Sequence, residues 1–191
     1  MKILGICGSL RVDGNSEWMV RTVLEAAKNV GAQVDIILLK DLNVRYCTGC
    51  DACHGNGGNC VLDDDMQRVY PKLLEANIIV VGSPNYFKNV SALTKNFIDR
   101  TNAFVRVKPR KLEGKYALGL CVGGEELEDT QHCEDALVRF FRGHKMKILS
   151  MVKAKGDEKG SVALNSELEK KLVDIGKKIA EGDFTGLASY R

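Results

Sequence analysis

The chain opens with the stretch KILGICGSLRVDGNS at residues 2–16, which contains an apolar run, a polar turn with two glycines and the start of a helical segment. Lys2 to Cys7 has the length and composition of a buried strand. From Ser16 to Val30 apolar residues recur at helical spacing, and Gly31 supplies the stop. A strand that runs through a short turn into a helix is one β-α unit, and such units build parallel sheets.

Four more β-α units follow the first. Runs rich in β-branched and aliphatic residues predict their strands at Gln33 to Leu39, Asn77 to Gly82, Tyr116 to Val122 and Lys147 to Val152. Helical spacing predicts their helices at Asp65 to Ala76, Ser91 to Thr101, Asp129 to Phe141 and Ser166 to Glu181. The middle runs are apolar on both faces, as a parallel sheet covered by helices requires. We therefore expect an α/β protein with a doubly wound, five-stranded parallel sheet in the flavodoxin-like order 2-1-3-4-5, with a ligand beyond the carboxyl ends of strands 1 and 3.

Length and charge exclude several classes of protein. With 191 residues, 45% hydrophobic and 28% charged, residues 1–191 are expected to form a single domain, and the composition is neither disordered, collagen-like nor membrane-spanning. The 28 Lys and Arg are interspersed with 25 Asp and Glu, so neither a nucleic-acid nor a membrane partner is indicated. The N-terminal apolar run is too short for an export signal and the seven cysteines are odd in number, so we expect a cytoplasmic protein.

The turn after the first predicted strand has the groups of an anion site. Backbone N–H groups, two hydroxyls, one amide and one guanidinium between Gly8 and Ser16 converge at a helix N-terminus. The turn lacks the lysine of a P-loop and the G-x-G-x-x-G spacing of a dinucleotide fold, so a phosphomonoester such as that of FMN fits better. The alternative is an ordinary turn in which Asn15 or Ser16 only caps the helix.

The turn after the third predicted strand, Gly82 to Ser91, suits a flat ring. Pro84 fixes one φ angle and favours a rigid loop with outward-facing N–H groups, which suit the pyrimidine edge of an isoalloxazine ring. Tyr86 or Phe87 would lie against the ring; the alternative is that both are core aromatics beneath a tight turn. After the fourth predicted strand, Gly123-Gly124 lacks Cβ atoms and would let the backbone approach a planar ligand closely.

Four of the seven cysteines crowd into the long connection after the second predicted strand. They form the pattern C-x2-C-x2-C-x6-C, at Cys47, Cys50, Cys53 and Cys60. The spacing of three lets one curled stretch present three thiolates, and the glycine-rich segment that follows lets the chain reverse and bring in the fourth. This pattern predicts a [4Fe–4S] cluster on an embedded loop at residues 47–60, with Zn²⁺ and a regulatory disulfide as the alternatives. The rest, Cys7, Cys121 and Cys133, are predicted to be buried small hydrophobic residues.

These motifs together resemble the iron-sulfur flavoproteins, a branch of the NADPH-dependent FMN reductases within the flavodoxin-like superfamily. The resemblance is carried by the cysteine run and by four other segments: Gly8 to Arg11, Gly14 to Ser16, Ser83 to Phe87 and Lys95 to Arg100. It covers residues 1 to about 124 closely and the remainder only in the order of its elements. Reductases that lack a cluster share the flavin-binding turns, so the cysteine run separates the iron-sulfur members.

The resemblance implies FMN and one [4Fe–4S] cluster per subunit, a homodimer or homotetramer, and electron exchange with a ferredoxin-like carrier, with NAD(P)H as a candidate reductant. By position, it implies that the phosphate is held by Ser9, Arg11, Asn15 and Ser16. It also implies that the flavin is lined by Pro84, Asn85, Tyr86, Phe87 and Asn89, with Gly123 and Gly124 near its edge. Asn85 departs from the family pattern, which often has a small or apolar residue there.

A flavin and a cluster on one chain would connect two-electron and one-electron couples, because FMN accepts either one or two electrons and a [4Fe–4S] cluster transfers one. The cofactors then carry the chemistry, and no catalytic side chain is assigned. Because the cysteine loop follows an edge strand, we expect it beside the phosphate turn and away from the ring. The cluster is then expected to serve the flavin of a neighbouring subunit.

Two other functions are compatible with the same motifs. One is a cluster-free NAD(P)H-dependent FMN or quinone reductase, and the other is a flavodoxin-like redox sensor whose cysteines change partner binding when oxidised. The basic run Arg106, Lys108, Arg110 and Lys111 suits an acidic carrier or an NADPH phosphate, but is more simply interpreted as a solvated loop.

Overall fold

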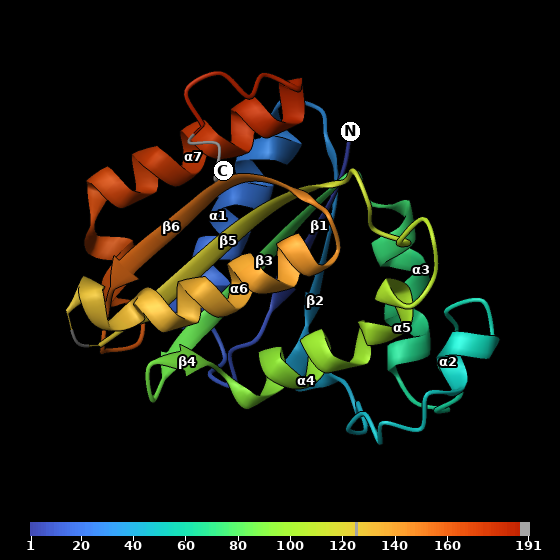
Figure 1. Cartoon of the computed structure of the whole chain (residues 1–191). Coiled ribbons are helices and arrows are strands. Elements are labelled where there is room, and N and C mark those ends of the chain that lie inside the picture. The colour runs from blue at the N-terminus through green and yellow to red at the C-terminus, as the bar shows by residue number, and fades with distance from the viewer. Residues whose placement is uncertain (125, 188–191) are drawn as a thin grey trace.

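The computed structural model describes residues 1–124 and 126–187 and contains a central parallel sheet (Figure 1). The sheet has the spatial order β2-β1-β3-β5-β6. Its strands are β1 (Lys2–Cys7), β2 (Gln33–Leu38), β3 (Ile78–Tyr86), β5 (Tyr116–Gly123) and β6 (Lys147–Lys155). The two-residue strand β4 (Asn89–Val90) pairs antiparallel with the end of β3. Counted along the chain without β4, this is the expected doubly wound order 2-1-3-4-5.

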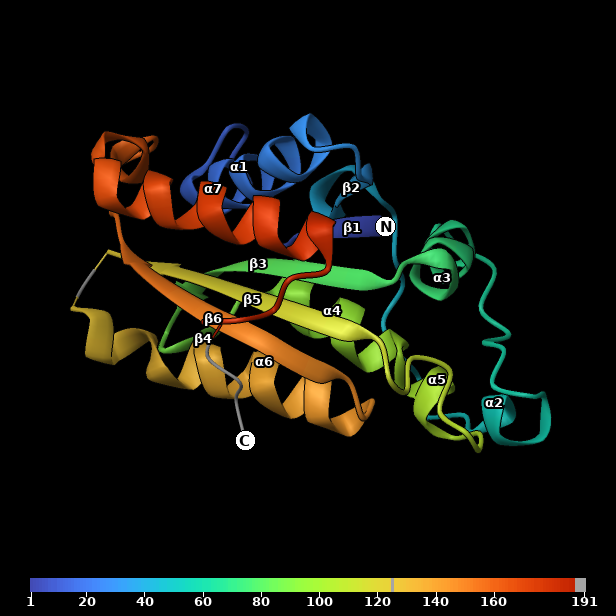
Figure 2. The same cartoon turned by 90° about the horizontal axis from the view of Figure 1, so that it is seen from above.

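Helices cover both faces of the sheet (Figure 2). One face carries α1 (Asn15–Asn29) and α7 (Ser166–Glu181), and the other carries α3 (Met66–Glu75), α4 (Ala92–Arg100) and α6 (Gln131–Gly143). Within the described residues, five single-turn helices, none of them predicted, lie in the connections: η1 (Leu39–Asp41), α2 (Ala52–Gly55), α5 (Asn102–Val105), η2 (Leu127–Thr130) and η3 (Ser161–Leu164). Over residues 1–124 and 126–187, no helix combines the length and hydropathy needed to cross a bilayer.

The apolar run of β3 is buried on both sides because its side chains alternate between two cores. Ile78 and Val80 pack with α1 and α7, whereas Ile79 and Val81 pack with the helices of the opposite face. All four side chains are fully buried. The sequence-based expectation of a sheet covered on both faces is therefore confirmed.

The end of β3 differs from the prediction. The strand was expected to stop at Gly82, but it continues to Tyr86 and pairs with Asn89 of β4 to form a hairpin. The two turn residues, Phe87 and Lys88, have φ angles of 50° and 57°. Two-residue hairpin turns require positive φ angles and are usually signalled by Asn-Gly or Asp-Gly, so the pair Phe-Lys gave no sequence signal for this turn.

Candidate functional site

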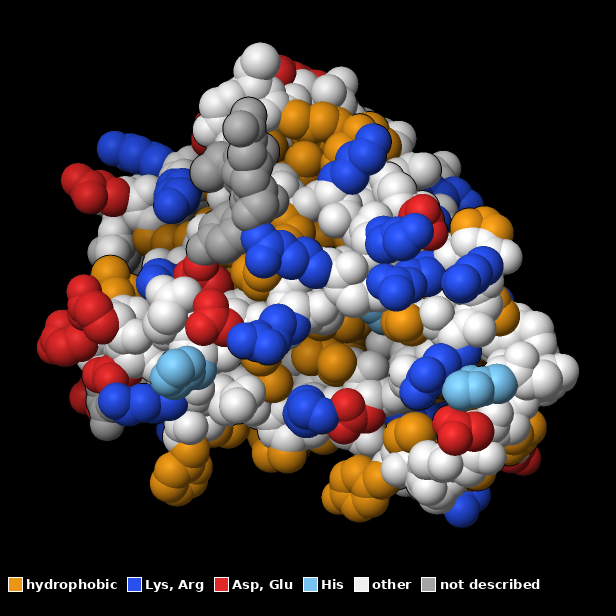
Figure 3. Space-filling model, in the orientation of Figure 1, with side chains coloured by type: hydrophobic (Ala, Val, Ile, Leu, Met, Phe, Trp, Pro, Cys, Tyr) orange, Lys and Arg blue, Asp and Glu red, His pale blue; other side chains and the backbone are white. Residues whose placement is uncertain are grey.

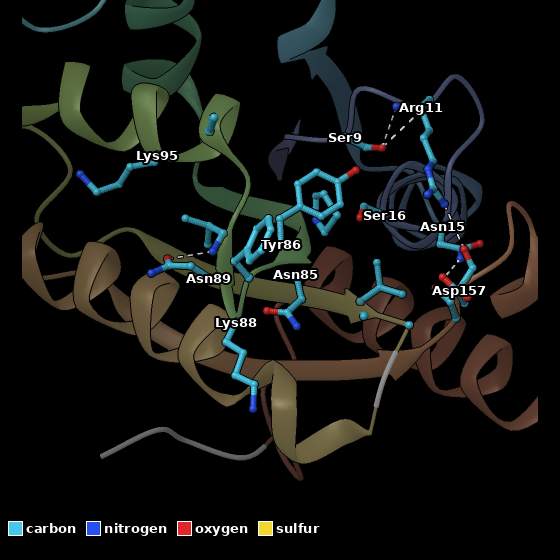
Figure 4. Close-up of a pocket in the computed structure, with 18 residues that line it drawn as sticks. Ser9, Arg11, Asn15, Ser16, Asn85, Tyr86, Lys88, Asn89, Lys95 and Asp157 are labelled. Carbon is cyan, nitrogen blue, oxygen red and sulfur yellow. Dashed lines mark hydrogen bonds between the residues drawn. The ribbon is translucent and has the colours of Figure 1, made fainter.

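A cavity of about 1220 Å³ opens beyond the carboxyl ends of β1, β3 and β5 (Figure 4). Every residue that the sequence assigned to the flavin lines it, namely Ser9, Arg11, Asn15, Ser16, Pro84, Asn85, Tyr86, Phe87, Asn89, Gly123 and Gly124. Sequence reasoning missed seven further lining residues: Lys88, Val90, Ala92, Lys95, Val122, Gly156 and Asp157. The last two belong to the long connection after β6, whose length was the only signal that it could take part in a site. The predicted turns therefore converge on one pocket.

The turn from Gly8 to Ser16, here called the phosphate turn, leads from β1 into α1. Gly14 occupies the N-cap position and no side chain caps the helix, so the capping alternative for Asn15 and Ser16 is wrong. Asn15 Nδ2 instead donates to the carbonyl oxygens of Gly156 and Glu158, at 3.0 and 2.9 Å. These bonds draw the connection after β6 over the turn and complete the pocket wall.

Two buried polar atoms at this turn fit a bound phosphomonoester with a hydroxylated chain. Among the described residues, Ser16 Oγ and Asn15 Oδ1 are buried and have no hydrogen-bond partner. An unpaired buried polar atom is costly unless a ligand supplies its partner. A hydroxyl can donate to a phosphate oxygen, and an amide oxygen can accept from a ligand hydroxyl. The residues present therefore fit FMN.

A network of hydroxyls fixes the first and third turns against each other. Ser91 Oγ donates to the carbonyl oxygen of Gly8 at 2.6 Å and caps α4 by accepting from Thr94 N. The Ser83 hydroxyl accepts from Ser91 N and from Thr94 Oγ1, both at 3.1 Å. A Cβ on Gly8 would lie 1.8 Å from Thr94 Oγ1, so only glycine permits this approach. The two turns are thereby held rigid before any ligand binds.

The aromatic residues of the third turn line the pocket instead of the core. Tyr86 is 40% exposed and Phe87 is fully exposed, so the alternative of two core aromatics is wrong. Figure 4 shows Tyr86 between the phosphate-turn residue Ser9 and the strand residue Asn85. Asn85 Oδ1 is also buried without a partner among the described residues, so this departure from the family pattern adds a polar atom to the wall.

Gly123, the last residue of β5, and Gly124 after it lie close to protein side chains as well as to the pocket. A Cβ on Gly123 would lie 2.9 Å from Thr130 Cγ2, and one on Gly124 would lie 2.7 Å from Asp157 Oδ1. Both residues line the pocket, but the close approach that requires glycine is to protein side chains. The missing Cβ atoms therefore let η2 and the connection after β6 close around the site.

Three cations line the pocket, and their partners differ. Lys88 Nζ lies 2.6 Å from Asp129 Oδ1, and Lys95 Nζ lies 2.6 and 2.7 Å from the two oxygens of Asp99. Arg11 Nη1 donates to the backbone carbonyl of Asp157 at 3.0 Å. Because a carbonyl oxygen carries no net charge, Arg11 retains its positive charge for an anionic ligand. The phosphate turn is therefore the electropositive end of the pocket.

The four clustered cysteines line a second, small cavity of about 30 Å³. All four are free thiols, and Gly57 and Gly58 adopt left-handed φ angles of 57° and 72° that reverse the chain before Cys60, as expected from the sequence. Four thiols around one cavity fit the donor set of a [4Fe–4S] cluster. In the part of the chain that the structure describes, no three His, Cys, Asp or Glu side chains already have an arrangement that could hold a metal ion.

The cysteine loop does not lie where the sequence placed it. It packs against α4 and α5, on the side of the sheet opposite α1, and not beside the phosphate turn (Figure 1). Asn96 Nδ2 donates to the carbonyl oxygen of Val44 at 2.9 Å, and Lys111 Nζ donates to Asn59 Oδ1 at 2.9 Å. These bonds hold both arms of the loop, and they join segments too far apart in sequence for local patterns to reveal.

The thiols differ in environment. The backbone N–H of Ala52 and then the Thr48 hydroxyl lower the pKa of Cys50, whereas burial raises the pKa of Cys53. Cys7, Cys121 and Cys133 are buried, as predicted. Burial raises the pKa of Cys7 to about 11, which favours its unreactive thiol form. Reactive sulfur chemistry is therefore concentrated in the loop.

Comparison with known proteins agrees with this arrangement. Residues 1–159 match the family model of NADPH-dependent FMN reductases. An iron-sulfur flavoprotein of Methanosarcina thermophila is 33% identical, with 92% of this chain and 95% of the relative covered. One of Archaeoglobus fulgidus is 30% identical over 93% of this chain and 96% of the relative. A solved flavone reductase superposes with a TM-score of 0.75 at 24% identity, covering 99% of this chain and 66% of that one.

The flavin-binding turns, the family model and the two iron-sulfur flavoproteins that align over most of their length lead to one conclusion. The chain belongs to the NADPH-dependent FMN reductase family, within its iron-sulfur flavoproteins, and is a flavin-dependent oxidoreductase or electron-transfer protein.

Proposed function

We propose that the protein passes electrons between FMN and a [4Fe–4S] cluster held by Cys47, Cys50, Cys53 and Cys60. One observation carries the proposal: two separate sites lie on one chain, a large pocket with unpaired buried polar atoms and a small cavity lined by four free thiols. When both groups are bound, the flavin supplies two-electron chemistry and the cluster supplies one-electron transfer. Residues 47–60 then act as an embedded loop of a single domain.

In this proposal the polypeptide binds and orients, and no side chain is assigned a proton transfer. Arg11 supplies positive charge at the phosphate, and the Ser16 hydroxyl supplies a donor. Tyr86 and the exposed Phe87 provide apolar surface for the flat ring. The pocket is larger than the 300–1,000 Å³ range typical of small-ligand sites, which leaves room for a second molecule such as NAD(P)H beside the flavin.

The partners follow from the surroundings of the loop. Lys111 contacts Asn59, so the basic run at residues 106–111 lies directly beside the cysteines, where it would attract an acidic, ferredoxin-like carrier. Cys47 and Cys50 are exposed, which suits a cluster that also faces a second subunit in a homodimer or homotetramer. Seven free cysteines suit a reducing compartment such as the cytoplasm.

The test is purification without oxygen, followed by iron and flavin analysis. We expect about four irons per chain, broad visible absorbance beneath the flavin bands, and one FMN. Cys50→Ala is expected to lose the iron and keep the FMN, because the flavin turns lie elsewhere. Cys133→Ala, at a buried cysteine of α6 outside the loop, is the control and should keep the iron.

Two outcomes contradict the proposal in different ways. Yellow, iron-free protein that turns over with NAD(P)H would make it a cluster-free FMN or quinone reductase. Protein without flavin turnover under any reductant, whose association with other proteins depends reversibly on cysteine oxidation, would make it a redox sensor.

A further inference from the structure

Arg100, the last residue of α4, is buried behind the cysteine loop. Its side chain has no exposed surface, and its partner Asp64 is 3% exposed. The guanidinium pairs with both oxygens of Asp64 and donates from Nη1 to the carbonyl oxygen of Arg45 at 2.7 Å. Nη2 also lies 3.5 Å from Cys60 Sγ. One cation therefore contacts the segment that enters the cysteine loop and the cysteine at its far end.

Asp64 holds this cation in place. Its carboxylate accepts from the backbone N–H groups of Arg45 and Met66, at 2.9 and 3.0 Å. The Tyr70 hydroxyl donates to the Arg100 carbonyl oxygen at 2.8 Å and closes the same buried cluster. This buried ion pair and its hydrogen bonds hold the guanidinium beside Cys60.

A buried ion pair such as this one is weak evidence for a role in stability. Removing two charges from water costs about as much as their attraction returns, and well-packed apolar residues often replace such pairs without loss. Arg100 Nε is moreover buried with no hydrogen-bond partner among the described residues, which adds to the cost. A buried cation that contacts a cysteine sulfur therefore indicates a role for Arg100 at the cysteine loop.

We propose that Arg100 positions Cys60 for the [4Fe–4S] cluster and tunes the reduction potential of that cluster, with Asp64 opposing the effect of its charge. The inference rests on the proposed function and assigns these two residues a part in it. Reduction adds one negative charge to the cluster and its sulfurs. A cation and an N–H donor at one sulfur stabilise the reduced form, and a nearby carboxylate destabilises it.

Opposite charges predict opposite shifts. Arg100→Gln should lower the reduction equilibrium constant on the order of tenfold, which is about 59 mV to more negative potential for a one-electron couple. Asp64→Asn should shift the potential in the positive direction, because the guanidinium then acts without compensation. Arg100→Lys keeps the charge and should lie closer to the wild type than Arg100→Gln does. Arg68→Gln, which removes an exposed cation on α3, is the matched control and should leave the potential unchanged.

The measurement is a potentiometric titration of the anaerobic holoprotein with dithionite, monitored through the spectrum of the reduced cluster. Iron per chain is determined on the same samples. Where Arg100→Gln fails to fold, the double variant Asp64→Asn/Arg100→Gln, which leaves no buried charge, carries the test and should lie negative of Asp64→Asn. If Arg100 and Asp64 had only a structural role, replacing them would lower the iron content per chain without shifting the reduction potential in opposite directions.

Two results separate the two claims. Wild-type protein without iron overturns the proposed function itself. If the wild-type protein holds a cluster, and the reduction potential of that cluster is unchanged in Arg100→Gln, Asp64→Asn and the double variant, only the inference about Arg100 is overturned.

Discussion

Replacing Ser16 by alanine separates ligand binding from folding. Ser16 is 2% exposed and its hydroxyl is buried without a partner among the described residues, so the apoprotein gains nothing from that hydroxyl. A hydrogen bond to a charged group contributes about 1.5–3 kcal/mol, so its loss at the FMN phosphate should weaken binding roughly 10- to 150-fold. The apoprotein should be as stable as the wild type or more stable by up to about 1 kcal/mol, because an unpaired buried hydroxyl is removed.

Two measurements test this pair of effects: quenching of flavin fluorescence on titration of FMN into apoprotein, and urea unfolding of the apoprotein. The matched control is Ser91→Ala, whose hydroxyl is equally buried but fully paired. It should destabilise the apoprotein by about 2 kcal/mol through loss of the α4 cap and of the bond to Gly8. FMN affinity of Ser16→Ala within twofold of the wild type would refute the reasoning, as would an apoprotein destabilised as much as the control.

Three further predictions concern pH, salt and backbone. Burial lowers the pKa of His144 from 6.5 to about 4, so between these pH values only the unfolded chain takes up the proton. About 3 kcal/mol of stability is therefore lost as pH falls from 6.5 to 4. His144→Gln should make the free energy of urea unfolding less dependent on pH over this range. Replacing Arg106 and Lys108 by glutamine should make electron transfer to an acidic ferredoxin less sensitive to salt, and an unchanged slope in stopped-flow kinetics would count against docking there. Gly58→Ala places a Cβ 2.7 Å from the Ala103 carbonyl oxygen at a φ of 72° and should reduce iron per chain. Gly114→Ala at a φ of 82° meets no described atom within 4 Å and should cost only about 1–2 kcal/mol of strain; equal iron loss in both would contradict the reasoning.

The sequence predicted those features that depend on local periodicity. Lys2–Cys7 and Ser166–Glu181 have the predicted bounds, because an apolar run between polar turns and an amphipathic stripe both announce themselves within one element. The residues that line the large pocket were predictable for a related reason, since they lie at or just beyond the carboxyl ends of strands that a parallel sheet brings to one edge.

Features that depend on contacts between distant segments escaped prediction. Asp157 joins the pocket because Asn15 binds the backbone on either side of it, 141 and 143 residues away in sequence, and Arg11 binds its carbonyl oxygen. The place of the cysteine loop likewise depends on Asn96 and Arg100, which follow it by some 40 to 55 residues. No spacing within the loop encodes those partners.

Helix α4 relates the two sites to each other more directly than the strand order does. Its N-cap residue Ser91 holds the phosphate turn through Gly8, Lys95 lines the flavin pocket, and its last residue Arg100 reaches Cys60. From Ser91 to Arg100 the helix rises about 13 Å at 1.5 Å per residue. The same helix therefore contacts the turns of the flavin pocket at its first end and the cysteine loop at its last residue. Strand order alone predicted a cysteine loop beside the phosphate turn, whereas the loop lies at the far end of a short helix whose N-cap residue is bonded to that turn.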